Sequence, residues 1–254
     1  MPCWKVWSSF TSEAFPLLKH LGIHDCPKLG GDLPNHLPAL ETLTINNCGL
    51  LVSSLPRAPT LQTLEILESN KVMLNVFPPL VESIEVKGSS MVESMIAAIA
   101  NNQPTCLQSL TLWNCSSAIS FPGGRLPALL KTLNILWLKK LEFPVQHKHK
   151  MLESLSITNS CDSLKSLPLV TFPNLKSLQI TKCENMESLG VSCIVEFGPK
   201  FPISMALSLM TNGFSKHQEI EIYFSFGKGC HLTQGWWMDI GGRMFLKGRI
   251  SHTA

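Results

Sequence analysis

The sequence is poor in charge and has no long hydrophobic run. Charged residues make up 15% of the 254 residues, and the formal net charge of +3 is too small and too scattered for a surface that binds a nucleic-acid backbone. No stretch reaches the roughly 18 apolar residues of a membrane span, and the N-terminus has no apolar run of signal-peptide length. We therefore expect neither a nucleic-acid partner nor a membrane span.

Motifs for metal binding, redox chemistry and catalysis are also missing. The nine cysteines are spread along the chain without a CxxC pair or a Cys/His quartet at zinc-finger spacing, which favours reduced thiols in a cytoplasmic protein. No GxxxxGKS/T phosphate loop occurs, and no paired carboxylates or catalytic triad stand out. The sequence predicts no enzyme activity, no cofactor and no metal site.

A recurring LxxLxI core is what the sequence does contain. Its second apolar position falls at Leu21, Leu43, Leu64, Ile84, Leu110, Leu133, Leu155 and Leu178. Successive steps are 22, 21, 20, 26, 23, 22 and 23 residues, within the range of about 20–29 that is typical of leucine-rich repeats. Each core alternates apolar and polar residues, as a strand with one buried face does. The copies must therefore stack into a parallel sheet to bury that face.

The segments between the cores contain many Leu-Pro and Phe-Pro pairs, such as those at residues 55–56, 121–122 and 167–168. Proline disfavours a helix at the preceding residue, so these connections should be extended or turn-like. The longest step is the exception. It contains SMVESMIAAIANNQ, where Ser90 and Glu93 fit a capping box ahead of a turn or two of helix.

These patterns predict an α/β repeat fold, a leucine-rich-repeat solenoid with a parallel concave β-sheet and a mostly non-helical convex side. About eight repeats should occupy residues 15–189, after a partial repeat or N-terminal edge at residues 1–14. Residues 190–254 lack the repeat and are expected to be a divergent, poorly ordered tail, in which EIEIYFSF is typical of a strand.

Two other rows recur along the repeats, and one polar segment stands apart from them. Cys26, Cys48, Cys115 and Cys183 lie five residues after the second apolar position, where we interpret them as packed core thiols. A row of hydroxyl residues precedes the same position in seven copies, which indicates a crowded strand surface rather than a catalytic serine. The segment 147–150, HKHK, has the alternation of a metal clip but no third ligand nearby, and we interpret it as a solvated loop.

The remaining outward positions vary freely, which suits a binding surface. Trp113 and Leu136 should be neighbours on consecutive strands, with Leu67 two strands away, and apolar residues in contact on a surface suggest a partner patch. The alternative is partial cover by neighbouring side chains. The candidate protein-binding residues are Glu65, Leu67, Glu85, Lys87, Thr111, Trp113, Asn134 and Leu136.

The segments FPLLKHLGIHDCPKL, LPNHLPALETLTINNCGLL and FPNLKSLQITKCENMESL resemble the leucine-rich repeats of plant disease-resistance proteins of the coiled-coil nucleotide-binding (NB-ARC) class, over about residues 1–189. MPCWKVWSS is similar to a phrase inside such arrays, so the resemblance implies a fragment without the family's N-terminal domains. It also implies recognition of a pathogen-derived or host protein, and contact with a nucleotide-binding domain that this chain lacks.

Three functional hypotheses follow. The first is a protein-recognition module of the defence-receptor type. The second is the substrate-recognition part of a ubiquitin-ligase adaptor, although such adaptors favour helical convex segments and no F-box precedes the repeats. The third is a truncated relic without activity.

Overall fold

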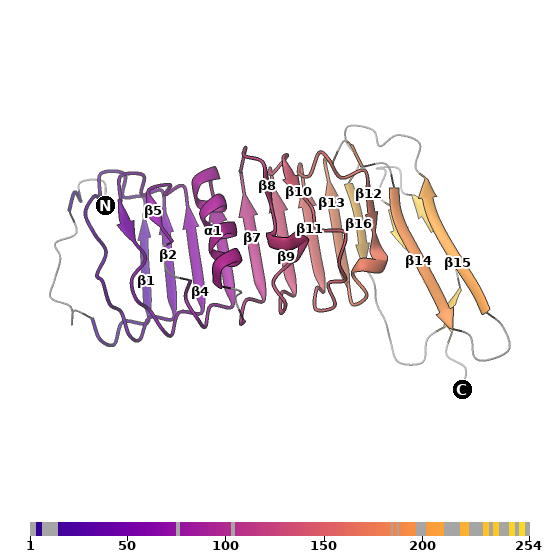
Figure 1. The fold of residues 1–254 in the computed structure, drawn as a ribbon, viewed down its shortest axis with the longest axis horizontal. Coiled ribbons are helices and arrows are strands. Elements are labelled where there is room, and N and C mark those ends of the chain that lie inside the picture. Colours follow the sequence, from indigo (N-terminus) through magenta and orange to yellow (C-terminus); the bar gives the residue numbers. More distant parts are fainter. Residues whose placement is uncertain are drawn as a thin grey trace.

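The repeats form one continuous row of parallel strands. The computed structural model describes residues 4–6, 15–74, 77–102, 105–183 and 185–186 in full, and beyond residue 186 the backbone of separate strands. In Figure 1 the strands stand side by side along the longest axis and follow the order of the sequence. The eight parallel strands are β1 (His20–His24), β2 (Thr42–Asn46), β4 (Thr63–Leu67), β6 (Ser83–Lys87), β7 (Ser109–Trp113), β9 (Thr132–Leu136), β11 (Ser154–Thr158) and β13 (Ser177–Thr181).

Equivalent positions of neighbouring repeats pair with one another along the whole row. Leu43, for example, pairs with Leu21 on one side and with Leu64 on the other, and Ile45 pairs with Ile23 in the same strands. The two apolar positions of each strand point inward, and their side chains are 0–4% exposed from β2 to β13. These two ladders form the core of the solenoid, as the alternation in the sequence predicts.

A residue in the left-handed conformation follows each of the eight strands. Its φ is positive in every repeat, at Asp25, Asn47, Glu68, Gly88, Asn114, Trp137, Asn159 and Lys182. Just after it comes the row that contains the predicted core cysteines. Cys26, Cys48 and Cys115 are buried, as predicted, whereas Cys183 in the last of these repeats is half-buried.

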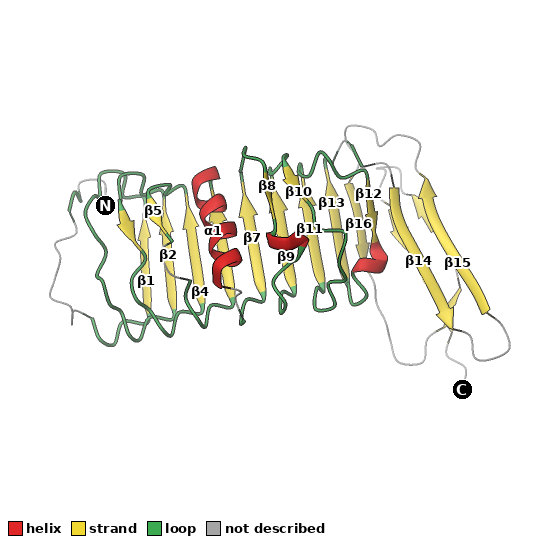
Figure 2. Ribbon diagram, viewed as in Figure 1, coloured by secondary structure: helices red, strands yellow, loops and turns green. Residues whose placement is uncertain are grey.

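Short β-pairs and turns make up the opposite side of the solenoid. β3 (Ser53–Ser54) pairs with β5 (Val72–Met73), and β8 (Ile119–Ser120) pairs with β10 (Leu141–Glu142). β12 (Ser166–Pro168) pairs with β14 (Ser188–Glu196). The 3-10 helix η1 (Pro122–Gly124) follows β8, and the 3-10 helix η2 (Leu169–Thr171) follows β12. Figure 2 shows how little of the described array is helical. The molecule is therefore a leucine-rich-repeat solenoid with a mostly non-helical convex side, as predicted.

The exception is α1 (Ser89–Asn102), which occupies the longest repeat step. Its side chains at six positions, Met91, Val92, Met95, Ile96, Ala98 and Ile99, are buried against the core. The predicted helix is confirmed, but its 14 residues exceed the turn or two that we expected. The capping prediction was wrong, because the helix begins at Ser89, so Ser90 lies in its first turn. Gly88, with φ of +105°, follows β6, and its carbonyl accepts the Val92 N–H.

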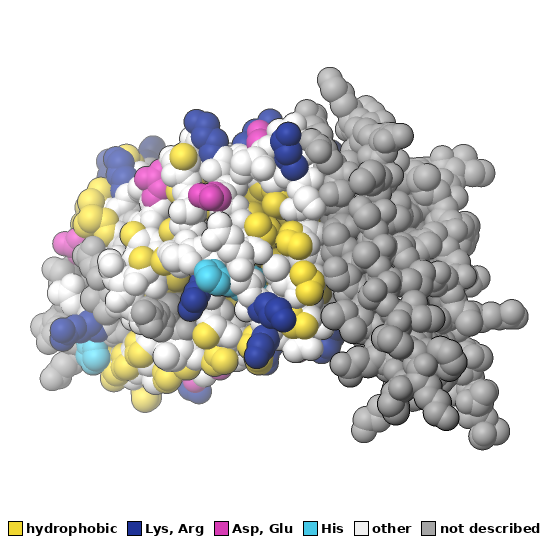
Figure 3. All heavy atoms as spheres, turned by 45° about the vertical axis from the view of Figure 1, so that its right-hand side comes forward, with side chains coloured by type: hydrophobic (Ala, Val, Ile, Leu, Met, Phe, Trp, Pro, Cys, Tyr) yellow, Lys and Arg dark blue, Asp and Glu magenta, His cyan; other side chains and the backbone are white. Residues whose placement is uncertain are grey.

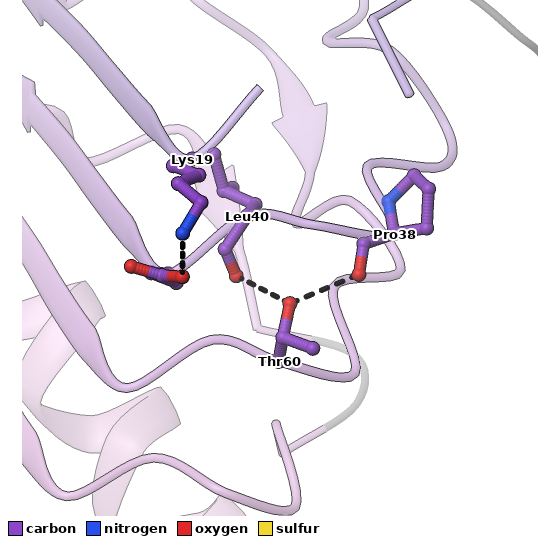
Figure 4. Close-up of polar contacts among 5 residues, drawn as sticks. Lys19, Pro38, Leu40 and Thr60 are labelled. Atoms are coloured by element: carbon purple, nitrogen blue, oxygen red, sulfur yellow. Dashed lines mark hydrogen bonds and ion pairs between the residues drawn. The ribbon is translucent and has the colours of Figure 1, made fainter. Parts of the chain in front are cut away.

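Polar side chains also connect neighbouring repeats at the start of the strands. The hydroxyl of Thr60 lies 2.9 Å from the carbonyl oxygens of both Pro38 and Leu40, to which it donates (Figure 4). In the same view, Lys19 Nζ lies 2.9 Å from a carboxylate oxygen of Glu41. These contacts add polar links between repeats, although exposed ion pairs of this kind contribute little stability.

Beyond the eight parallel strands the structure describes further strands by their backbone. They are β14 (Ser188–Glu196), β15 (Pro202–Met210), β16 (Glu219–Tyr223), β17 (His231–Thr233), β18 (Trp236–Met238), β19 (Met244–Leu246) and β20 (Arg249–Ser251). β16 pairs antiparallel with β13, so the strand predicted in EIEIYFSF is confirmed. The stretches of the predicted tail outside these strands, and residues 1–3 and 7–14 of the predicted N-terminal edge, lie outside the described residues. In the described part, no helix is long and apolar enough to cross a bilayer.

Candidate recognition surface

The eight predicted binding residues lie on four neighbouring strands, β4, β6, β7 and β9, with side chains that point away from the core. We call the outward side of the eight parallel strands the strand face. Seven of the eight predicted residues are half-buried, and the eighth, Thr111, is buried. Trp113 and Leu136 pair across β7 and β9, so the prediction that they are neighbours is confirmed. Leu67 lies two strands from Trp113, with Lys87 of β6 between them.

A hollow of about 370 Å³ opens on the strand face between β6 and β13. Five of the predicted residues line it, namely Glu85, Thr111, Trp113, Asn134 and Leu136, and the other lining residues are Ser154, Leu155, Ser156, Ser177 and Gln179. The serines of β11 and β13 are much smaller than the indole and isobutyl groups beside them. The hollow therefore forms where short side chains follow long ones along the row.

Hydrogen bonds hold the polar side chains of this hollow. Asn134 Nδ2 donates to the hydroxyl of Thr111 at 3.1 Å, across β9 and β7. Ser156 Oγ donates to Gln179 Oε1 at 3.3 Å, across β11 and β13. Because these side chains already have partners in place, little side-chain entropy remains to be lost when a ligand binds, which favours recognition by a preformed surface.

Two tryptophans meet at one end of the hollow. The rings of Trp113 and Trp137 have centroids 6.0 Å apart and are tilted by 58°. Trp137 was absent from the predicted set, because it follows β9 rather than lying in it. The signal that could have found it is the residue type, since Asn, Asp or Gly occupies the same place in five of the other repeats. Trp137 has a φ of +56° and is 45% exposed, an uncommon combination for a bulky residue.

Trp113 carries an unpartnered polar atom. Its indole Nε1 is buried and has no hydrogen-bond partner of good geometry in the described structure. Buried N–H groups without a partner are rare in folded proteins and costly. The Glu85 carboxylate is close enough for the indole N–H to lower its pKa, so this N–H faces the protein's own acidic group rather than an open ligand position.

The acidic side chains of the strand face lie close together. Glu65 and Glu85 are register partners on β4 and β6. The pKa of Glu85 is raised, mainly by burial and also by the Glu65 charge, while the nearby indole N–H of Trp113 partly offsets the rise. Lys87 does not neutralise this pair directly, because its Nζ forms an ion pair with Glu68 at 2.7 Å. This end of the hollow therefore carries unbalanced negative charge.

The repeated cysteines and hydroxyls provide structure in the described repeats. The thiols of Cys26 and Cys48 donate to the carbonyls of the last residue of their own strands at 3.2 Å. Burial raises the pKa of the Cys48, Cys161 and Cys183 thiols, which keeps them protonated and poor as nucleophiles. Ser69 and Ser160, in the same row as the cysteines, each accept a backbone N–H from the preceding repeat. Among the described residues, no group of three or more His, Cys, Asp or Glu side chains could hold a metal ion.

Comparisons with known proteins show a partial relationship to plant proteins. The chain is 33% identical over 118 residues to an Arabidopsis thaliana protein named as a disease resistance protein, which is 45% of this chain and 8% of that protein. It is 44% identical over 54 residues, 20% of this chain, to the disease resistance RPP13-like protein 1 of the same plant, of which 5% is covered. The chain thus matches only a small part of these proteins. No family model and no solved structure matches it.

Proposed function

We propose that this chain, which is homologous to a small part of plant disease resistance proteins, is a protein-recognition module that acts in plant defence. The observation that carries the proposal is the preformed hollow of the strand face, lined by Trp113, Leu136 and hydrogen-bonded polar residues, with Trp137 against the ring of Trp113. Its role is binding rather than catalysis, and we place it in the cytoplasm, where buried thiols stay reduced. The partner is a pathogen-derived or host protein.

The chemistry of the surface indicates what such a partner presents. Aromatic side chains, Trp above all, are among the groups that most often dominate binding energy at an interface, with truncation costs of about 2 kcal/mol or more. The unbalanced carboxylates at Glu65 and Glu85 favour a basic side chain. A segment with a basic residue next to an apolar one fits both features.

The architecture does not favour the ubiquitin-ligase alternative. Apart from α1, the described connections between the strands of the solenoid are extended segments, turns and the short η1 and η2. The adaptors that we considered have regular helical convex segments. The defence-type module therefore has the better support.

Binding experiments with variants of the strand face test the proposal. The chain is screened against secreted pathogen proteins and leaf proteins, and each hit is measured by biolayer interferometry. We expect the double variant Trp113→Ser, Leu136→Ser to weaken the relevant hits at least about tenfold, because it removes the apolar rim of the hollow. Thr44→Ala with Asn46→Ala changes the same face at β2 and is the matched control.

The two variants distinguish binding through the hollow from binding elsewhere. A partner that loses affinity with the hollow variant but keeps it with the β2 control supports recognition through the hollow. Thermal melting of each variant establishes that the fold is intact. If every hit binds the hollow variant as tightly as the wild type, the strand face is not the recognition surface.

A further inference from the structure

A second hollow lies on the segments that return the chain to strands β9 and β11. It has a volume of about 500 Å³ and is formed by residues 125–130 of one repeat and 147–152 of the next. Its residues differ from those of the strand-face hollow. Leu126, Leu130 and Leu152, which are 8% exposed or less, form an apolar floor. The site is therefore independent of the function proposed above.

The buried side chain of His149 fixes the shape of one wall. Its Nε2 lies 3.0 Å from the carbonyl oxygen of Pro144, and its ring stacks on Phe172 with centroids 5.5 Å apart. Its backbone N–H donates to the Thr171 carbonyl at 2.7 Å. The interpretation of residues 147–150 as a solvated loop was thus wrong for His149, because an aromatic pocket and two hydrogen bonds compensate its burial.

Burial lowers the pKa of His149, although the Pro144 carbonyl partly opposes this. A neutral imidazole that links Pro144 to Phe172 holds the loop without adding charge. Its neighbours Lys148 and Lys150 are exposed on either side of it in the sequence. The loop therefore presents two lysines from a fixed backbone.

The charge of this hollow is all of one sign. Arg125, Lys148 and Lys150 line it together with His147, and no Asp or Glu is among the lining residues. Within the described structure, none of these three cations has an ion-pair partner. By contrast, Lys19, Lys87 and Lys176 each reach a glutamate of a neighbouring repeat at 2.7–2.9 Å. In Figure 3, Lys and Arg side chains gather beside a His side chain on one face of the described surface.

We propose that this hollow binds an acidic peptide segment of a protein partner, with an apolar side chain on the leucine floor and Asp or Glu side chains toward Arg125, Lys148 and Lys150. Charge complementarity selects the sign of the ligand. The apolar floor selects a peptide over a simple phosphate or a nucleic-acid backbone, since those offer no apolar group to cover it. A loop held in place by His149 loses little entropy when the peptide binds.

A labelled peptide and charge-reversed variants of the full chain test this proposal. The probe is a fluorescein-labelled peptide in which two leucines are flanked by three Asp or Glu residues on each side, and binding is read by fluorescence anisotropy. Two comparison peptides replace the acids by Asn and Gln, or the leucines by Ser. We expect the probe to bind, with an affinity that falls as salt rises, and both comparison peptides to bind at least about tenfold more weakly.

Matched variants locate the site. Arg125→Glu, Lys148→Glu and Lys150→Glu together should weaken the probe at least about tenfold. Lys139→Glu with Lys140→Glu reverses exposed charges outside the hollow and should change the affinity by no more than about twofold. His149→Phe keeps the stack on Phe172 but loses the bond to Pro144, so it should weaken binding without a change in net charge.

Three results would overturn the proposal. One is a wild-type chain that does not bind the probe. Another is a charge-reversed hollow that binds as tightly as the wild type. The third is equal binding of the serine-substituted peptide, or full competition by inorganic tripolyphosphate at matched charge, which would make the site a general polyanion surface rather than a peptide site.

Discussion

At the scale of single residues, the left-handed position after each strand governs how the chain turns into the next connection. Asn, Asp and Gly adopt this conformation readily, whereas other residues pay about 1–2 kcal/mol. Five of the eight places follow that preference, and Glu68, Trp137 and Lys182 do not. Two of these exceptions make contacts, since Glu68 forms an ion pair with Lys87 and the ring of Trp137 packs against Trp113. Backbone strain of this kind concentrates at functional sites.

Gly88 offers the sharpest test of this turn. Its φ of +105° lies outside the conformations that side chains tolerate, and a Cβ there would collide with the side chain of Asn70. We expect Gly88→Ala to destabilise the chain by about 2 kcal/mol, measured by urea denaturation. Gly49→Ala is the control, because no atom lies within 4 Å of a Cβ at that glycine. Equal stability of the two variants would contradict the account of the turn.

Lys182 offers a substitution that should stabilise the chain, in contrast to Gly88→Ala. It has a φ of +55° and is exposed. At the same place in another repeat, Asn47 tolerates the conformation and its Nδ2 donates to Asp25 at 2.9 Å. We expect Lys182→Asn to stabilise the chain by about 0.5–1 kcal/mol, seen as a higher urea midpoint at unchanged slope. Lys139→Asn replaces an exposed lysine without a positive φ, and a similar gain there would make the effect unspecific.

At the scale of the elements, neighbouring strands place like charges side by side. The register of β4 and β6 makes Glu65 the partner of Glu85, and like charges directly opposite are destabilising. On β7, Thr111 is the register partner of Glu85, and the indole N–H of Trp113 lowers the Glu85 pKa. On β6 itself, Lys87 forms its ion pair with Glu68. The sheet thus keeps a carboxylate where its charged form is unfavourable, which is typical of a surface retained for binding.

The pH dependence of stability follows from the direction of the Glu85 shift. A carboxyl group whose pKa is raised on folding binds its proton more tightly in the folded state, so its ionised form costs stability. That cost is absent below the unfolded pKa of about 4.3 and is complete once the pH has risen through the folded pKa. We therefore expect Glu85→Gln to raise the urea midpoint at pH 7 but to leave it nearly unchanged at pH 4.

The control for this prediction is Glu82→Gln, an exposed carboxylate just before the same strand. It should change the midpoint little at either pH. Glu65→Gln should share part of the gain at pH 7, because it removes the charge that opposes ionisation of Glu85. A Glu85→Gln variant that is less stable than the wild type at pH 7 would show that the carboxylate has a stabilising partner instead.

At the scale of the whole molecule, the sequence predicts the array far better than the surfaces on it. Strand positions and register follow from a fixed period and from alternation, which are properties of the repeat itself. The hollows depend on side-chain sizes across several strands or loops, such as the small Ser154 and Ser156 beside Leu136. Trp137 was missed because it follows its strand, although a Trp where five other repeats have Asn, Asp or Gly was a readable signal. His149 was missed because its burial cannot be read from a polar tetrapeptide.

The stacked core also fixes how far a packing defect is felt. In a solenoid each repeat contacts only its neighbours, so stability is nearly a sum of repeat and nearest-neighbour terms. Ile135 and Ile157 are fully buried register partners on β9 and β11. Ile45, equally buried, lies on β2, with β4, β6 and β7 between it and β9. The adjacent pair Ile135 and Ile157 and the distant pair Ile45 and Ile135 therefore differ in separation but not in residue type.

We expect Ile→Val at each of the three positions to cost about 0.5–1.5 kcal/mol. The distant pair, Ile45→Val with Ile135→Val, should be additive within about 0.3–0.5 kcal/mol, whereas the adjacent pair, Ile135→Val with Ile157→Val, should deviate by about 0.5 kcal/mol or more because the two sites share one packing space. Urea denaturation of the single and double variants measures both couplings. A distant coupling as large as the adjacent one would mean that the core responds as a single rigid unit, because strain would then cross three intervening strands.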